Sequence, residues 1–113
     1  MCLKKTLLGL LLGVVVVPTS GNARAASSAD LELCKTMSGV ASSVMEARQA
    51  GVRMSRLMEK AAEIGGYWGE LMPVFIEEAY RQPVFSSDEE QTAATADFED
   101  KIYASCLRTR GKK

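Results

Sequence analysis

The stretch of sequence that decides the fold is DLELCKTMSGVASSVMEARQAG, residues 30–51. At 100° per residue its apolar side chains fall on one side of a helix and most of its polar side chains fall on the other. Asp30 is a suitable N-cap, and Gly51 suits the left-handed C′ position that ends a helix. We therefore predict a helix from Asp30 to Gly51, with an apolar stripe made of Leu33, Cys34, Met37, Val40, Ala41, Val44, Met45 and Ala47.

The chain before this helix has the pattern of an export signal. Lys4 and Lys5 form a positive start, Thr6–Val17 is an apolar run, Pro18 breaks it, and Ala23–Ala25 is an A-x-A cleavage site. The competing interpretation is an uncleaved membrane anchor, which requires roughly 20 apolar residues, more than this run provides. We predict a signal peptide that is removed, and a periplasmic or secreted protein.

Cleavage divides the chain into a signal peptide, residues 1–25, and a single domain, residues 26–113. It removes three of the 14 basic residues and none of the 14 acidic residues, which leaves a net charge of −3. That charge is too mild to indicate nucleic acid as a partner. We expect no stable membrane span after cleavage.

Two cysteines, Cys34 and Cys106, remain in this domain. In an exported chain such a pair predicts a disulfide, which could stabilise the fold by roughly 4 kcal/mol. The chain contains no histidine, so two thiols cannot complete a tetrahedral zinc site. No redox C-x-x-C motif is present either.

Three further helices are expected after Gly51. The second carries the stripe Leu57, Ala61, Ile64 and Trp68, which predicts Trp68 in the core. At the glycine pair inside this stripe the helix either frays or allows the close approach of a neighbour. The third begins between Gly69 and Pro73, because proline is tolerated only in a first turn. The fourth runs from Asp88 to about Arg108, behind a capping box formed by Ser87 and Glu90.

The predicted disulfide constrains how many helices there are. Cys34 lies near the start of the first helix and Cys106 lies near the end of the last. In an up-and-down arrangement these two ends meet only when the number of helices is even. The predicted fold is therefore all-α, a small antiparallel four-helix bundle closed by one disulfide.

Residues that could carry chemistry are few. Without histidine the commonest general base and metal ligand is missing, and acidic clusters such as Glu77–Glu78 are more typical of solvated helix faces. Thioethers of Met45, Met54 and Met58 could gather around Cu(I), although methionine at helical spacing usually fills a core. We expect no enzymatic activity, no cofactor and no structural metal.

Three residues are candidates for a site. Arg48 projects from the apolar stripe of the first helix, near its end. Either its stem packs while its charged head reaches water, or the guanidinium binds an acid such as Glu77, Glu78 or Asp88–Glu90, a helix-end carbonyl, or an anionic ligand. We predict that it binds the acids or carbonyls and so holds this end of the bundle. Tyr67, off the stripe, and Phe85, in a linker, are candidates for a partner surface. Glu99 falls within an apolar arc, where pairing with Lys60 or simple exposure would explain it.

Several short motifs carry a family resemblance: Cys34 with Met37, Met45-Glu-Ala-Arg-Gln-Ala-Gly51, Glu78-Ala-Tyr80 before Pro83, and Phe98 with Tyr103-x-x-Cys106. They resemble a group of uncharacterised small exported helical bacterial proteins, often encoded near phage-derived genes. The resemblance implies helices and export, and it supplies neither an activity nor a ligand.

The functional expectation is a non-enzymatic exported interaction protein that binds a protein or an envelope component. The alternatives are a small-ligand or Cu(I) carrier that uses the bundle interior, and a periplasmic chaperone. An apolar cavity or solvent-open methionines would favour the carrier. A filled core with an exposed apolar patch would favour the interaction protein.

Overall fold

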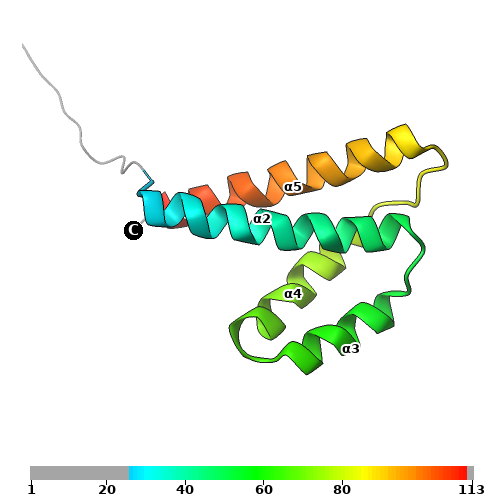
Figure 1. Cartoon of the computed structure of the whole chain (residues 1–113), viewed down its shortest axis with the longest axis horizontal. Helices are drawn as coiled ribbons and strands as arrows, with labels where there is room; N and C mark the ends of the chain where they lie inside the picture. The colour runs from blue at the N-terminus through cyan, green and yellow to red at the C-terminus, as the bar shows by residue number, and fades with distance from the viewer. Residues whose placement is uncertain (1–25, 112–113) are drawn as a thin grey trace, which may run out of the picture.

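The computed structural model describes residues 26–111 as four helices and their connections, with no strand in that range (Figure 1). The helices are α2 (Ser28–Gln49), α3 (Met54–Ile64), α4 (Gly66–Ala79) and α5 (Asp88–Gly111). The all-α prediction is confirmed for this part of the chain. The predicted signal peptide, residues 1–25, lies outside the described residues. Among the described helices, we find none with the length and apolar composition that a membrane span requires.

The N-cap of the first helix, α2, is Ser27 and not Asp30, three residues earlier than predicted. The Ser27 hydroxyl accepts from the Asp30 N–H at 3.1 Å, and the Asp30 carboxylate accepts from the Ser27 N–H at 3.3 Å. This reciprocal pair is a capping box. At the other end Gly51 has φ = 85°, as predicted, and the Val52 N–H donates to the Ala47 carbonyl. This Schellman motif turns the chain toward α3.

The helices α2 and α5 form a long antiparallel pair (Figure 1). The predicted disulfide joins Cys34 to Cys106, with 5.5 Å between the Cα atoms. Ser87 caps α5 as predicted, since its hydroxyl accepts from the Glu90 N–H at 3.1 Å. An even number of helices brings both cysteines to one end of the molecule, so the four-helix prediction is confirmed together with the disulfide.

The boundary between α3 and α4 differs from the prediction. Gly65 and Gly66 have positive φ angles of 65° and 62°, so α3 ends at Ile64 and a new helix starts directly afterwards. Trp68 therefore belongs to α4 and is half-buried, where the predicted stripe placed it in the core. The stripe assumed one continuous helix phase across the glycine pair, and the left-handed turn resets that phase.

The prediction that Pro73 would lie in a first turn is also wrong, since it lies inside α4. The helix continues although proline lacks the N–H that would donate to the Gly69 carbonyl. Gly69 also lies close to the backbone of α3. A Cβ added there would lie 2.7 Å from the Ala61 carbonyl oxygen. The absence of a side chain at Gly69 therefore lets the two backbones meet.

Most of the packing between helices follows the order α5–α2–α4–α3. The α3–α4 hairpin diverges from the α2–α5 pair, and α3 lies at the outer edge (Figure 1). To the buried apolar cluster α3 contributes only Ala61. Much of the α3 surface is therefore open to solvent. The buried cluster consists of Ala41, Val44, Met45, Ala61, Met72, Phe75, Ile76, Ala79 and Phe98.

Candidate functional site

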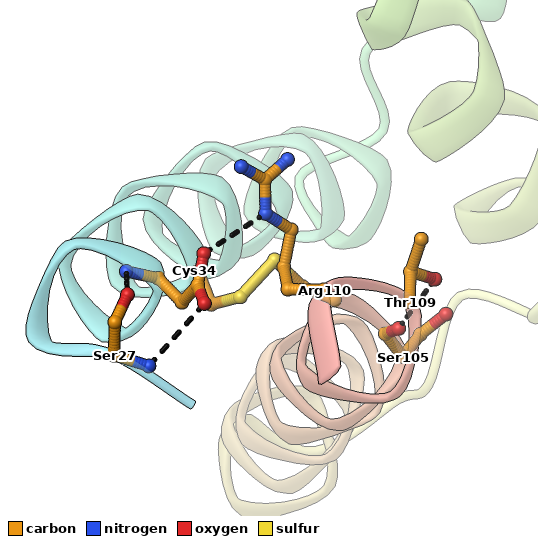
Figure 2. Close-up of polar contacts among 7 residues, drawn as sticks. Ser27, Cys34, Ser105, Thr109 and Arg110 are labelled. Carbon is orange, nitrogen blue, oxygen red and sulfur yellow. Dashed lines mark hydrogen bonds and ion pairs between the residues drawn. A yellow bond between two sulfur atoms is a disulfide. The ribbon is translucent and has the colours of Figure 1, made fainter. Parts of the chain in front are cut away.

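One end of the molecule, the disulfide end, joins the start of α2 to the end of α5 (Figure 2). Cys34 and Cys106 are buried there. The Arg110 Nε donates to the Asp30 carboxylate at 3.2 Å, beside the disulfide. The Ser27 backbone N–H and the Arg110 guanidinium hold the pKa of the Asp30 carboxyl below its ordinary value. The disulfide and the Arg110–Asp30 ion pair together hold this end of the molecule, and the charged groups here already pair with each other.

Arg48 lies at the opposite end, the linker end, where residues 80–87 connect α4 to α5. Its Nε donates to the Gln82 carbonyl at 2.9 Å, and its guanidinium lies 4.8 Å from the centre of the Tyr80 ring. The partner is thus a carbonyl, but it belongs to the linker and not to a helix end as predicted, since α4 ends at Ala79. The predicted acidic partners are wrong: Arg48 forms no ion pair among residues 26–111, and Glu78 instead pairs with Lys101 at 2.6 Å. Arg48 is half-buried and holds the linker against α2.

The residue that does most to hold this linker is Gln49, which the sequence reasoning missed. Its side chain is 5% exposed, its Nε2 donates to the Pro83 carbonyl at 2.8 Å, and its Oε1 accepts from the Phe85 N–H at 2.9 Å. Gln91 adds a bond from its Nε2 to the Phe85 carbonyl at 2.6 Å. A glutamine on the polar side of a helix carries no signal of such burial, because the linker that covers it comes from 34 residues further along the chain.

Phe85 is therefore held through its backbone, and its ring is half-buried. It borders a pocket of about 420 Å³ between α2, α5 and the linker. Apolar side chains of Met45 and Phe98 lie beside acidic and basic groups in this lining. The full lining is Met45, Gln82, Phe85, Glu90, Ala93, Ala94, Asp97, Phe98 and Lys101.

Tyr67 is 57% exposed, and its ring lies edge-on to Trp68 with 5.3 Å between ring centres. It borders a groove of about 300 Å³ at the side where α4 diverges from the α2–α5 pair; we call this the α4–α5 groove. Val74, 59% exposed, lies on the same groove and was not predicted. The lining is Met37, Tyr67, Leu71, Val74, Phe75, Ile102, Ser105, Cys106, Thr109 and Arg110.

The α4–α5 groove and Phe85 are far apart in the fold, so the two aromatic residues predicted for a partner surface do not form one site. Tyr67 borders a groove at the disulfide side, which includes Cys106. Phe85 borders a pocket at the linker end. The groove is lined mainly by apolar side chains, and its one charged residue, Arg110, already pairs with Asp30. Its chemistry suits an apolar group.

The pairing considered for Glu99 with Lys60 is absent. Glu99 is half-buried and forms no ion pair among residues 26–111, while Lys60 lies 4.0 Å from Glu63 of its own helix. The two are separated because α3 packs on α4 and not against α5. The acid that connects α4 to α5 is Glu78, and Lys101 holds the pKa of its carboxyl below the ordinary value.

The methionines considered as copper ligands lie in or against the core. Met45 is buried, and its sulfur accepts from the Gln49 Nε2 at 3.6 Å. Met54 and Met58 are half-buried and pack against the apolar cluster. Within the described residues, no three acidic, cysteine or histidine side chains gather in a way that could hold a metal ion.

The groove is thus the strongest candidate site on the described part of the chain. It combines exposed apolar groups with a floor that includes the buried Phe75. Exposed apolar surface of this kind is typical of contacts with other molecules. Comparison with protein-family models, with curated proteins and with solved structures finds no match to this chain, so its function is inferred from the geometry above.

Proposed function

We propose that this chain is an exported, non-enzymatic interaction protein that binds an apolar segment of another protein in the α4–α5 groove. The observation that supports it is that Tyr67 and Val74 are each more than half exposed. Both lie beside a groove whose lining includes the buried Phe75. Soluble monomers rarely leave apolar side chains grouped in this way unless a partner covers them.

The energetics favour a protein partner. Fully burying a large apolar side chain contributes about 1.5–3 kcal/mol; since Tyr67 and Val74 are 57% and 59% exposed, covering the rest of both would contribute about 2–3 kcal/mol. Tyrosine is also enriched among the residues that dominate interface energies. The groove, about 300 Å³, is at the low end of the range for small-molecule sites, and suits one or two inserted side chains.

Export is supported by the disulfide. Bonds such as Cys34–Cys106 persist in oxidising compartments and are rare in the cytosol. The pattern of residues 1–25 is consistent with this placement.

The Cu(I) carrier is less well supported, because Met45 is buried and already accepts a hydrogen bond. An interaction role requires neither a metal nor a cofactor.

Site-specific photo-crosslinking in the envelope of the native host tests this proposal. A photoreactive amino acid is placed at Tyr67, at Val74, or at the exposed Ser43 on α2 as a control. We expect the same protein adduct from positions 67 and 74, and none of that mass from position 43. The further substitution Val74→Glu should abolish the adduct at position 67. Equal labelling from all three positions, or no adduct from the two groove positions, would contradict the proposal.

A further inference from the structure

The turn from α2 to α3 carries a concentration of positive charge that the groove does not explain. Arg53, Arg56 and Lys60 are spaced by three and four residues, so they lie along one side of α3. All three are exposed. Together with Gly51, Val52 and Leu57 they line a pocket of about 420 Å³, which we call the α3 pocket.

The charge in this pocket is unbalanced. Residues 26–111 contain nine basic and 14 acidic side chains, yet three of the nine cations and none of the acids line the α3 pocket. Within the described residues Arg53 and Arg56 form no ion pair. Lys60 lies 4.0 Å from Glu63, with both side chains mostly exposed, and such a surface pair is weak. The pocket can therefore accept an anion without breaking a strong internal contact.

The α3 pocket is also partly apolar. Val52 and Leu57 are half-buried in its lining, and Ile64, 52% exposed, lies two turns beyond Leu57 on the same side of α3. Cations beside exposed apolar side chains match a molecule that has an anionic head and an apolar body. A basic amphipathic helix face is the arrangement that binds the surface of an anionic membrane.

We propose that the α3 pocket binds the phosphate headgroup of an anionic phospholipid and holds the protein at a membrane surface. Arg53, Arg56 and Lys60 contact the phosphate, and Leu57 and Ile64 lie against the first carbons of the lipid. The position of α3 at the outer edge of the molecule lets it meet a flat surface (Figure 1). This inference does not rest on the α4–α5 groove, which lies on another part of the fold.

Vesicle flotation tests the proposal. The protein is expressed from the full chain, with whatever processing the host carries out, and is kept oxidised so that the disulfide is intact. The vesicles contain either phosphatidylglycerol mixed with phosphatidylcholine or phosphatidylcholine alone. The test variant is Arg56→Gln/Lys60→Gln. The control is Lys35→Gln/Arg108→Gln, which removes the same charge from exposed positions on α2 and α5. Because the compared proteins share residues 1–25 and any processing of them, the N-terminal segment contributes equally to each.

We expect binding to the phosphatidylglycerol vesicles only. Each cation near an anionic surface contributes about fivefold to affinity, so the test variant should bind roughly thirtyfold more weakly. The control should stay within about fivefold of the wild type, and Arg56→Lys/Lys60→Arg should retain binding. Far-ultraviolet circular dichroism confirms that each variant is folded.

Three outcomes would overturn the proposal. The first is an absence of binding to phosphatidylglycerol vesicles. The second is an equal loss of binding in the test and control variants, which would indicate a general charge effect. The third is binding of soluble glycerol phosphate at the α3 pocket, seen as chemical shifts of Arg56 and Lys60, without vesicle binding. Failure of this test would leave the crosslinking result at Tyr67 and Val74 unaffected.

Discussion

The same substitution, glycine to alanine, should have opposite effects at two helix positions in this protein. Gly39 lies in α2, and a Cβ built on it meets nothing within 4 Å. Gly69 lies in α4, and a Cβ built on it lies 2.7 Å from the Ala61 carbonyl oxygen of α3. In both helices alanine is favoured by about 1 kcal/mol over glycine on propensity alone. The difference between the two variants therefore isolates the contact between α3 and α4.

The magnitude follows from that contact. Gly39→Ala should raise the free energy of unfolding by about 0.5–1 kcal/mol. At Gly69 the clashing atom is a backbone oxygen, which moves only if α3 moves, so overpacking costs about 1–3 kcal/mol and exceeds the gain in propensity. Because the gain in propensity is common to both variants, we expect them to differ by the cost of overpacking, about 1–3 kcal/mol, in urea unfolding monitored by circular dichroism. If Gly69→Ala is as stable as Gly39→Ala, the α3 and α4 backbones do not approach as closely as described.

Three further substitutions test other contacts. Cys34→Ala/Cys106→Ala should lower the free energy of unfolding by about 4 kcal/mol, since the bond closes a separation of 72 residues, and the melting temperature by roughly 15–30 °C; an unchanged melt would contradict a structural role for the disulfide. Gln49→Met keeps the length of the side chain but removes its bonds to the linker, so urea unfolding should show a loss of about 1–3 kcal/mol, and a gain would refute that assignment. Glu78→Gln should destabilise the protein at neutral pH, because Lys101 lowers the pKa of the folded carboxyl below 4.5. That difference should persist above pH about 4.5 and disappear as the pH falls through the folded pKa, and a difference independent of pH would argue against the ion pair.

Prediction from the sequence succeeded where the determining interactions are local. The Gly51 turn and the Ser87 cap depend on residues within a few positions of one another, so their signals are visible in short windows. The disulfide is long-range, but residues 26–113 contain only two cysteines, which leaves one pairing within the predicted domain. At the start of α2 two residues, Ser27 and Asp30, both suit the N-cap position, so the local sequence does not distinguish them. The capping box uses both, with Ser27 as the N-cap.

The site was predicted less well than the fold. Tyr67 was identified as a surface residue, but the groove beside it depends on how far α4 diverges from the α2–α5 pair. The turn at Gly65–Gly66 also changed the helix phase and moved Trp68 out of the core. A pattern of apolar residues cannot report a phase change that occurs within two residues.

Arg48 and Gln49 show what the sequence determined and what the tertiary structure decided. The sequence alone determined that a helix ends just after them and that a buried guanidinium would need a partner, because periodicity and desolvation act on each residue wherever it lies. Only the tertiary structure decided that the partners are the carbonyls of Gln82 and Pro83. Those backbone groups carry no residue-specific signal, and they reach α2 only after α3 and α4 have packed and returned the chain to this end.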